Sequence, residues 1–276
     1  MRLTVRVTVA KLGCIASTTL IESLLDERAS REDIVVRSFS SGTKMDIQSA
    51  KNIAGLISSI PSDVILLVTP NASLKEPRSL AKTLSKRAPT TVISDAPAKK
   101  AISEFDKNKI GYIIMEADSL IGVRKEFLDP IEMALFNSDA IKVLAATGAF
   151  RALHEEIDRL IESAKKKRIS LPKLIVDKEV AVNHGEFSNP YAKAKAMASF
   201  GMANLVGELS VEGAYRVKER ERYLTIVASA HELMRKAALL ADQAREIEKS
   251  SDSVARHVHI PDGSLKKKKR FFQELQ

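Results

Sequence analysis

The sequence is short of several residue types, and each shortage excludes a class of protein. It holds a single cysteine, Cys14, so an internal disulfide is impossible and a reducing cytosol is the expected setting. Tryptophan is absent and aromatic residues make up only 5%, whereas hydrophobic residues make up 45%, which predicts an aliphatic, alanine-rich core. No segment approaches about 18 uninterrupted apolar residues, so we expect no membrane span. Arg2, Arg6 and Lys11 interrupt the first apolar residues, so we expect no signal peptide and a cytoplasmic protein.

The sequence also lacks the short motifs that indicate common catalytic mechanisms. There is no Walker sequence, no GxSxG and no HExxH, and the turn KLGCIAS (11–17) lacks the GxGxxG of a dinucleotide fold. The histidines show no metal-ligand spacing. His257 and His259 alternate along a strand-like stretch and would share one face, but the sequence offers no third ligand. We therefore expect no metal site. The residues by themselves do not indicate which reaction the protein catalyses.

The charge is moderately basic and unevenly spread. The formal net charge is +9, of which the tail SLKKKKRFFQELQ (264–276) accounts for +4. The remaining +5 suits a polyanionic small ligand. The tail also motivates a nucleic-acid-binding alternative, but no aromatic platform interleaves with its cations, since Phe271 and Phe272 stand alone. We therefore expect no nucleic-acid partner.

Apolar bursts rich in β-branched residues alternate with helical patterns over the first part of the chain. The alternation predicts an α/β fold with a Rossmann-like, mostly parallel sheet of about six strands. The expected strands are 3–10, 33–39, 63–70, 90–94, 111–116 and, after a long helical interruption, 173–177. The third of them is almost wholly apolar, which indicates burial on both faces.

The chain divides into three expected regions. Residues 1–120 form the α/β sheet domain, and 121–250 form a helical region with one added strand near 173–177. Residues 251–276 form a small C-terminal β segment, in which Asp262-Gly263 between two short extended runs predicts a hairpin, followed by the basic tail. There is no internal repeat and no long linker.

Ligands of an open parallel sheet bind beyond the carboxyl ends of its strands. The candidate cofactor-binding residues in these loops are Lys11, Gly13, Cys14, Ile15, Pro70, Asn71, Asp95, Ala96 and Pro97. Each of these loops can also be an ordinary turn that binds no ligand and whose lysines are solvated. A helix N-terminus can lower the pKa of a thiol, but the sequence identifies no basic partner for Cys14. We therefore expect it to pack against the turn rather than act as a nucleophile.

The segment DPIEMALFNSDAIKVLAATGAF (129–150) predicts a long helix with Asp129 as its cap. One stripe at helical spacing holds mostly small or short side chains: Pro130, Ala134, Asn137, Ile141, Ala145 and Gly148. Such a stripe lets a partner helix or a flat ring approach the backbone. His231 and Arg235 lie one turn apart on a later helix, where they form an exposed pair or line a site.

Several long segments closely resemble one archaeal family, the methylenetetrahydromethanopterin dehydrogenases that use the deazaflavin coenzyme F420. The similar segments are FLDPIEMALFNSDAIKVLAATGAFR, NPYAKAKAMA (189–198), SVEGAY (210–215) and ERYLTIVASAHELMRKAALLADQAREIEKS. LLDERASRED (24–33), GYIIMEADSLIGVRKEFLDP and the basic C-terminal hairpin are also similar. The resemblance covers essentially the whole chain in order.

The resemblance implies a reaction and an assembly. The reaction is reversible hydride transfer between reduced F420 and methenyltetrahydromethanopterin, which gives the methylene form, as in methanogenesis or its reverse. It implies an α/β domain, a helix bundle, a small C-terminal β segment and a homohexamer built as a trimer of dimers. It implies no essential acid or base. For the pterin substrate we expect Asp129, Asn137, His231 and Arg235 on the helical region.

Three ligand loops differ from the usual pattern of this family. The first loop reads KLGCIAS, the loop after the third strand reads PNASLKEP with Leu74, Lys75 and Glu76 intruding, and SDAP replaces GDAP. The same pterin chemistry with NADP or a modified cofactor is therefore the alternative. A paralogue that assembles but has lost activity is a further one.

Overall fold

A computed structural model of the chain describes residues 4–27, 29–119, 126–127 and 129–276. Residues 120–122 of the loop expected after the fifth strand lie outside these ranges. Residues 28, 123–125 and 128, in segments that carry the family resemblance, also lie outside them. No helix within the described ranges is long and apolar enough to cross a membrane.

A single parallel sheet of six strands organises the first two thirds of the chain. Its strands are β1 (Val5–Lys11), β2 (Ile34–Ser40), β3 (Val64–Thr69), β4 (Thr90–Asp95), β5 (Gly111–Met115) and β6 (Lys173–Val176). Their order is β2-β1-β3-β4-β5-β6. The expected sixth strand is confirmed, since Tyr112 pairs with Lys173 and Met115 with Val176 in parallel register. Every residue of β3 is buried, as its apolar sequence predicts.

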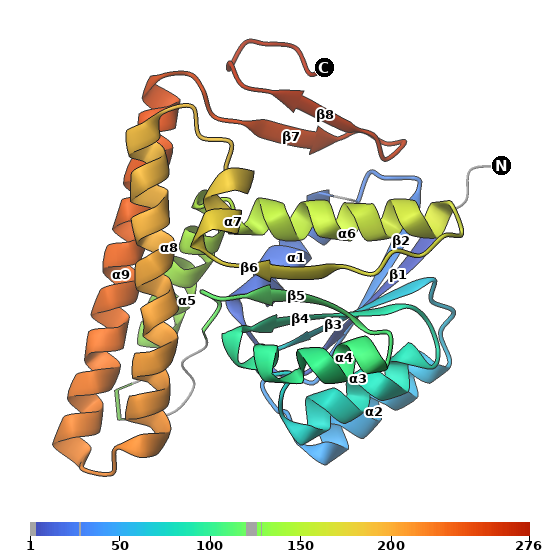
Figure 1. Cartoon of the computed structure of the whole chain (residues 1–276), viewed down its shortest axis with the longest axis horizontal. Coiled ribbons are helices and arrows are strands. Elements are labelled where there is room, and N and C mark those ends of the chain that lie inside the picture. Colours follow the sequence, from blue (N-terminus) through green and yellow to red (C-terminus); the bar gives the residue numbers. More distant parts are fainter. Residues whose placement is uncertain (1–3, 28, 120–125, 128) are drawn as a thin grey trace.

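Helices cover both faces of this sheet (Figure 1). One face carries α1 (Ala16–Glu27) and α6 (Ala149–Lys165), and the other carries α2 (Ile47–Ser58), α3 (Lys75–Ser85) and α4 (Ile102–Lys107). A short 3-10 segment, η1 (Ala96–Ala101), precedes α4. Asp46 caps α2 by accepting the backbone N–H of Ser49 at 2.7 Å, which satisfies a donor that the helix itself cannot pair. The sheet is therefore the middle of three layers.

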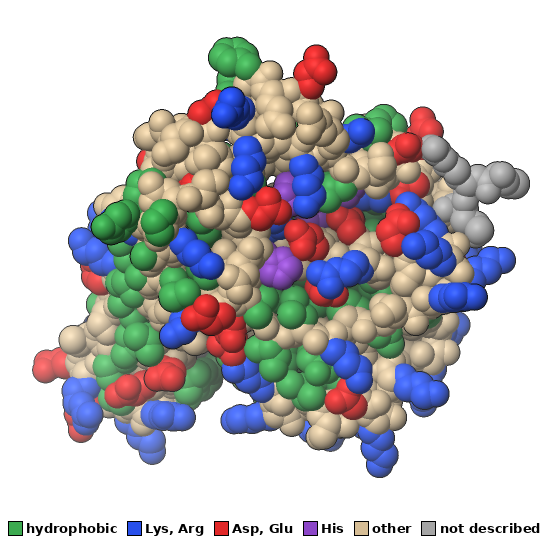
Figure 2. All heavy atoms as spheres, turned by 45° about the horizontal axis from the view of Figure 1, so that its top comes forward, with side chains coloured by type: hydrophobic (Ala, Val, Ile, Leu, Met, Phe, Trp, Pro, Cys, Tyr) green, Lys and Arg blue, Asp and Glu red, His purple; other side chains and the backbone are tan. Residues whose placement is uncertain are grey.

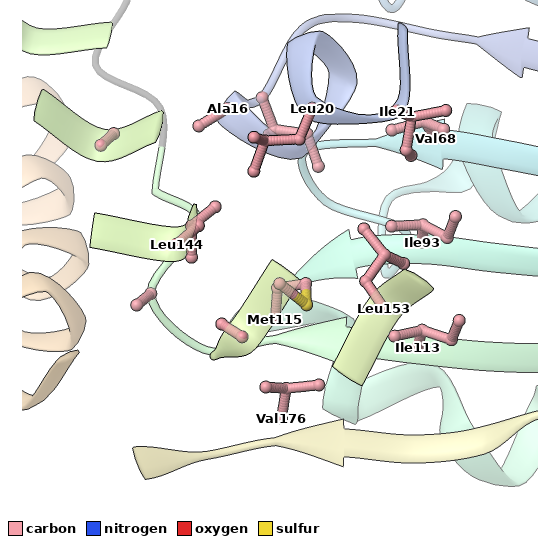
Figure 3. Close-up of a cluster of buried hydrophobic side chains, with 14 of the residues drawn as sticks. Ala16, Leu20, Ile21, Val68, Ile93, Ile113, Met115, Leu144, Leu153 and Val176 are labelled. Atoms are coloured by element: carbon pink, nitrogen blue, oxygen red, sulfur yellow. The ribbon is translucent and has the colours of Figure 1, made fainter. Parts of the chain in front are cut away.

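The core is aliphatic and rich in alanine, as the composition predicts. Figure 3 shows the cluster on the α1 and α6 face, where strand side chains such as Val68, Ile93 and Ile113 meet Leu153 of α6. A second cluster fills the opposite face beneath α2, α3 and α4. Burial on both faces explains why these strands read as nearly continuous apolar runs.

Three of the remaining helices, α5 (Pro130–Ala146), α8 (Pro190–Val211) and α9 (Arg220–Ser250), pack together at the carboxyl edge of the sheet. The short helix α7 (Lys178–His184) follows β6 and packs on α6 and α8. A π turn, η2 (Glu212–Arg216), links α8 to α9. The two long helices pack on each other, and α5 packs on α9 (Figure 1). Small buried residues such as Ala203, Ala237 and Ala241 allow this close packing. Tertiary contact between these apolar faces supplies most of the stability of such helices.

The long helix predicted over 129–150 ends earlier than expected, because α5 stops at Ala146 and the chain turns at Gly148 before α6 begins. Gly148 has φ +97°, a left-handed conformation that glycine adopts without strain. A Cβ at this position would lie 2.1 Å from the carbonyl oxygen of Ala181, so α7 packs directly against the turn. Gly148 therefore serves the turn between α5 and α6 rather than an uninterrupted small-residue stripe.

The expected C-terminal hairpin is confirmed. Strands β7 (Arg256–His259) and β8 (Leu265–Lys268) pair antiparallel, and Gly263 in their turn has φ +86°. Most of the lysine run therefore lies in a strand, so its side chains alternate between two faces instead of forming a free tail. The hairpin lies over α6 (Figure 1).

Candidate active site

The strand order reverses direction between β1 and β3. The chain leaves β1 toward β2 on one side, whereas β3 leads to β4 on the other. Ligands of open α/β sheets bind at such a switch point, outside the carboxyl ends of the strands. The predicted cofactor residues of the loops after β1 and β3 flank this point, at 11–15 and 70–71.

Gly13 brings the first and third loops together. Its φ of +83° favours glycine, and a Cβ there would lie 2.8 Å from both the ring of Pro70 and the side chain of Met45. The Gly13 N–H donates to Ser41 Oγ at 3.2 Å. The predicted neighbours Gly13 and Pro70 are therefore in close contact, and the loop after β2 completes the wall.

The other predicted residues of the first loop face different surroundings. Lys11 is nearly buried and forms an ion pair with Glu22 of α1. Ile15 is a core residue, 1% exposed, and its backbone N–H and carbonyl oxygen are both hydrogen-bonded to Thr18. Cys14 is half-buried, and burial, with the nearby Asp118 carboxylate, raises the pKa of its thiol. A raised pKa disfavours the nucleophilic thiolate, which agrees with a packing role.

The loops after β3 and β4 are joined to each other. Asn71 Oδ1 accepts hydrogen bonds from the N–H and the hydroxyl of Ser73, at 3.0 and 2.6 Å, which fixes the turn. The Ala72 N–H donates to Ser94 Oγ at 3.1 Å. This bond joins the loop after β3 to the end of β4, at the serine where the family resemblance leads us to expect glycine. Leu74, Lys75 and Glu76, which intrude in the third loop, form the cap and first turn of α3.

Two buried carboxyl groups lie at the ends of β4 and β5. Asp95 is 8% exposed and Asp118 is fully buried. Burial, with repulsion from Asp118, raises the pKa of Asp95 to about 8. Burial also raises the pKa of Asp118 to about 7, although its carboxylate accepts the Ser17 N–H at 3.1 Å. Asp95 is therefore largely uncharged at neutral pH.

Sequence reasoning missed Asp118. The loop beginning MEADS follows a predicted strand, but the sequence favours no single residue in it, because Glu116 and Asp118 look equivalent there. The structure separates them, since Glu116 pairs with Lys99 while Asp118 meets the start of α1. The useful sequence feature is a carboxylate two or three residues beyond a buried parallel strand.

Polar atoms without a hydrogen-bond partner gather at the same edge. Among the described residues, these buried atoms include Ser17 Oγ, Thr69 Oγ1, Asp95 Oδ1 and Ser119 Oγ. Buried polar atoms are normally paired with protein or water, so these four are the ones that water or a polar ligand can satisfy. Ala96 and Pro97 are half-buried beside them, at the start of η1.

The helical group meets this edge of the sheet. A Cβ at Gly207 of α8 would lie 3.5 Å from Ser119 Cβ, which is ordinary contact. The Tyr223 hydroxyl of α9 donates to Glu126 Oε1 at 2.9 Å, in the segment that leads into α5. The helices therefore close over the carboxyl ends of the strands, where the substrate residues are expected.

The predicted substrate residues separate into three environments. Asp129 caps α5 as expected, with Oδ1 accepting the Glu132 N–H at 2.7 Å. His231 is buried between the rings of Phe127 and Phe136, with centroids 4.9 and 4.7 Å away. Burial lowers the pKa of His231, so its ring is mostly neutral at neutral pH. Arg235, one turn further along α9, is exposed.

Asn137 lies on the outward part of α5. It is half-buried, while its neighbours on the stripe at 134 and 145 are exposed. The opposite face, including Phe136 and Val143, is buried. Asn137 points about 100° around the helix axis from Phe136, the residue of α5 whose ring packs on His231.

Comparison with known proteins gives the family. A profile of the methylene-5,6,7,8-tetrahydromethanopterin dehydrogenase family matches residues 5–276. The chain belongs to this family. An F420-dependent methylenetetrahydromethanopterin dehydrogenase of Archaeoglobus fulgidus is 53% identical over 262 residues, which is 95% of each chain. The protein of the same name from Methanocaldococcus jannaschii is 44% identical over 273 residues, or 98% of this chain and 99% of that one.

A solved structure of the family agrees with the fold. It is an F420-dependent methylenetetrahydromethanopterin dehydrogenase in complex with methylenetetrahydromethanopterin and coenzyme F420. It superposes with a TM-score of 0.95 at 41% identity, covering 99% of this chain and all of that chain. The Rossmann-like α/β architecture expected from the sequence is therefore confirmed.

The residues at the carboxyl edge fit the coenzyme of this family. A deazaflavin ring offers carbonyl and ring nitrogen atoms, and the unpaired Asp95 Oδ1 and Ser17 Oγ are polar groups of matching chemistry. A carboxyl group that is uncharged can donate a hydrogen bond to a ring carbonyl. It also does not repel the anionic tail of the coenzyme. The polar groups at this edge therefore match the chemistry of a polar and partly anionic molecule.

Proposed function

We infer that the chain catalyses reversible hydride transfer between reduced coenzyme F420 and methenyltetrahydromethanopterin, giving methylenetetrahydromethanopterin. The carrying observation is the match of the family profile from residue 5 to 276, together with relatives more than 40% identical over nearly the whole chain. The assignment makes the chain an oxidoreductase of one-carbon metabolism, with F420 as its cofactor.

For this reaction the main task of the protein is to position the two reactants. The methenyl carbon belongs to a stabilised cation, and the reduced deazaflavin is a strong hydride donor. Neither a nucleophile nor a Lewis acid is needed for such a transfer. Holding two reactants in a near-attack arrangement supplies roughly 7–11 kcal/mol at best. The chain's own part is to bind two rings, orient them and exclude water.

For the cofactor we propose the loops at the carboxyl edge of the sheet. The close contact of Gly13 with Pro70 and the bond between Ala72 and Ser94 support this, because a flat ring needs a fixed wall. The full proposed set is Lys11, Gly13, Cys14, Ile15, Pro70, Asn71, Asp95, Ala96 and Pro97. Asp118 acts as a positioning residue, since it contacts the start of α1 rather than open space.

For the pterin substrate we propose the helical side of the same edge. Asp129, Asn137, His231 and Arg235 remain the proposed residues. A neutral His231 and a half-buried Asn137 offer hydrogen bonds, while the exposed Arg235 offers charge to an anionic tail. None of the four is proposed as an essential acid or base.

We further propose that the protein works in the cytoplasm as a homohexamer, a trimer of dimers. Large apolar side chains exposed on the outer face of α5 and on α8 support an interface, because such groups are costly to leave in water. Ile131 is 71% exposed, Leu135 57% and Leu205 51%. Light scattering after size-exclusion chromatography tests the assembly, and a monomer at micromolar concentration would contradict it.

The reaction is tested by following deazaflavin absorbance with methylenetetrahydromethanopterin as the hydride donor. Reduction of F420 is expected, with no matching turnover of NADP. Turnover with NADP alone would transfer the assignment to a pyridine nucleotide. No turnover with either, despite F420 binding by calorimetry, would identify an inactive paralogue.

Asn137→Ala tests the substrate side. Loss of one hydrogen bond to the substrate, about 1 kcal/mol, should lower kcat/KM about fivefold while the melting temperature stays the same. Ser138→Ala, one position further on an exposed part of the same helix, is the matched control and should leave kcat/KM unchanged. If both variants behave like the parent enzyme, Asn137 leaves the proposed site.

A further inference from the structure

Four of the five histidines lie in one cluster that includes none of the proposed active-site residues. His154 of α6, His184 of α7, and His257 and His259 of β7 lie where the C-terminal hairpin crosses α6 and α7. Figure 2 shows histidine side chains on this face among carboxylates and cations. Hydride transfer at the carboxyl edge of the sheet uses none of them, so their clustering needs another explanation.

Three side chains of this group converge on one point. His154 Nε2 lies 3.4 Å from Asp158 Oδ2, and His259 Nε2 lies 3.0 Å from the same oxygen. His154 and Asp158 are one turn apart on α6, so both point to one side of the helix. The two imidazole rings have centroids 5.0 Å apart. One ligand atom from each residue lies within 4.8 Å of the other two.

These distances match those between neighbouring ligand atoms around one metal ion. Ligands about 2.0–2.1 Å from a tetrahedral zinc ion lie about 3.3 Å from one another. Asp158 Oδ2 therefore stands at such an edge distance from both imidazole nitrogens. Two imidazoles and one carboxylate favour a divalent transition ion such as zinc over magnesium or calcium, which prefer oxygen ligands.

The surroundings support a closed but reachable site. The His259 side chain is 2% exposed, and those of His154 and Asp158 are 13% and 20% exposed. Arg31 Nη1 lies 3.4 Å from the other oxygen of Asp158, a contact that orients the carboxylate as outer partners of metal ligands do. A cavity of about 660 Å³, lined in part by Asp158 and His259, opens beside the group and gives an ion and a water ligand access.

A neighbouring group of three possible metal ligands is surrounded by more positive charge. Glu155, Glu186 and His257 also lie close enough to share an ion. Its Glu186 already lies near two cations, Arg151 at 3.9 Å and Lys267 at 3.7 Å. Such cations compete with a metal ion for the carboxylate. In the described part of the chain, Asp158 has one such cation rather than two: Arg31 Nη1 lies 3.4 Å from its Oδ1, while the other two nitrogens of this guanidinium donate to Asp33.

We propose that His154, Asp158 and His259 form a binding site for a divalent transition-metal ion of the zinc type, which fastens the C-terminal hairpin to α6. The ligands come from a helix and from a strand more than a hundred residues later, so an ion at this point holds the two elements together. The ion is structural, because the trio lies near Asp33 and Gly263, where β2 begins, at the opposite edge of the sheet from the candidate active site.

Metal binding to the chelator-treated full-length protein tests the proposal. Titration with Co²⁺ should give visible d–d absorption that saturates at one ion per chain, and Zn²⁺ should displace it. Zn²⁺ should also raise the melting temperature, and a chelator should reverse the rise. His154→Gln and His259→Gln should each weaken binding by more than about 100-fold, because loss of a direct ligand exceeds the 10–100-fold effect of losing an outer partner.

The matched control is His257→Gln. His257 lies on the same face of β7 as His259 but is not one of the three proposed ligands. It should bind Co²⁺ like the parent protein. The proposal is overturned if the parent protein gives no saturable absorption and no stabilisation by Zn²⁺, or if both glutamine variants keep full affinity. Loss of binding in His257→Gln alone would overturn it in favour of the neighbouring trio. If the variants do not fold, X-ray absorption of the zinc-loaded parent decides, with two imidazole ligands expected and fewer than two contradicting the assignment.

Discussion

The carboxylate of Asp118 holds the first turn of α1 by accepting the backbone N–H of Ser17 with both oxygens, at 3.1 and 3.2 Å. The two residues are 101 positions apart, so this contact ties the end of β5 to the start of α1. Negative or polar groups are favoured at a helix N-terminus, where unpaired N–H groups and the helix dipole point.

Replacing Asp118 tests this contact. Asp118→Ala should lower the free energy of unfolding by about 1–3 kcal/mol, because the buried Ser17 N–H loses its acceptor. Asp118→Asn keeps an acceptor oxygen and should cost clearly less. Urea unfolding monitored by circular dichroism measures both. Equal losses in the two variants would mean that the contact contributes through charge rather than through the hydrogen bond.

Asp95 should make the protein less stable as the pH rises. Burial raises the pKa of Asp95 from 3.8 to about 8 in the folded chain. The folded state therefore binds more protons than the unfolded state across this interval, so stability present below about pH 4 is lost as the pH rises toward 8. Measured at several pH values, the unfolding free energy of the parent protein should fall over this window relative to that of Asp95→Asn, whose side chain does not titrate. Identical profiles of the two proteins would contradict the assignment.

Gly148 should tolerate no side chain. Gly148→Ala should destabilise the protein by at least about 3 kcal/mol, since left-handed backbone and overpacking against Ala181 both oppose the methyl group. Gly201 is the matched control, because it lies inside α8 with nothing within 4 Å of the point where a methyl group would lie. Gly201→Ala should stabilise by about 0.5–1 kcal/mol. Thermal melts of the two variants should therefore shift in opposite directions.

The ion pair of Arg31 with Asp33 should matter more than a similar pair at the surface. Both side chains are almost fully buried, with Nε and Nη2 of Arg31 donating to the two Asp33 oxygens at 2.8 and 2.6 Å. Asp33→Ala should cost about 3–5 kcal/mol, because it leaves a buried guanidinium without its main partner. Asp63→Ala breaks the comparably shaped but exposed pair with Arg6 and should cost much less. Chemical denaturation compares the two, and equal losses would show that burial does not set the difference.

The sequence is informative about the sheet because each strand carries its own apolar, β-branched pattern. Even β6 can be predicted, although α5 and α6 separate it from β5, because KLIVD stands out among helical patterns. The hairpin follows from Asp262-Gly263 for the same local reason. The end of α5 before Gly148 is harder to predict from the sequence, because a glycine among alanines is also typical of a close contact between two helices.

Contacts between distant residues are beyond the reach of sequence reasoning. His257 and His259 do share one face, as alternation along a strand predicts, and both side chains are buried. The carboxylate partner of His259 on α6 cannot be identified from the sequence, because nothing local places that helix under β7. Asp118 is missed for the same reason. In contrast, the contact between Gly13 and Pro70 follows from the rule that parallel strands end at one edge.

The position of β6 limits how this chain can fold during synthesis. When the ribosome has released residues up to the end of β5, the backbone edge of that strand has no partner, and its pairing segment is still about sixty residues away. An unpaired parallel edge is open to association with other chains. The segment that holds α5 and α6 must therefore cross one face of the sheet before β6 can pair with β5. A chain truncated before residue 173 should consequently aggregate rather than persist as a smaller soluble domain.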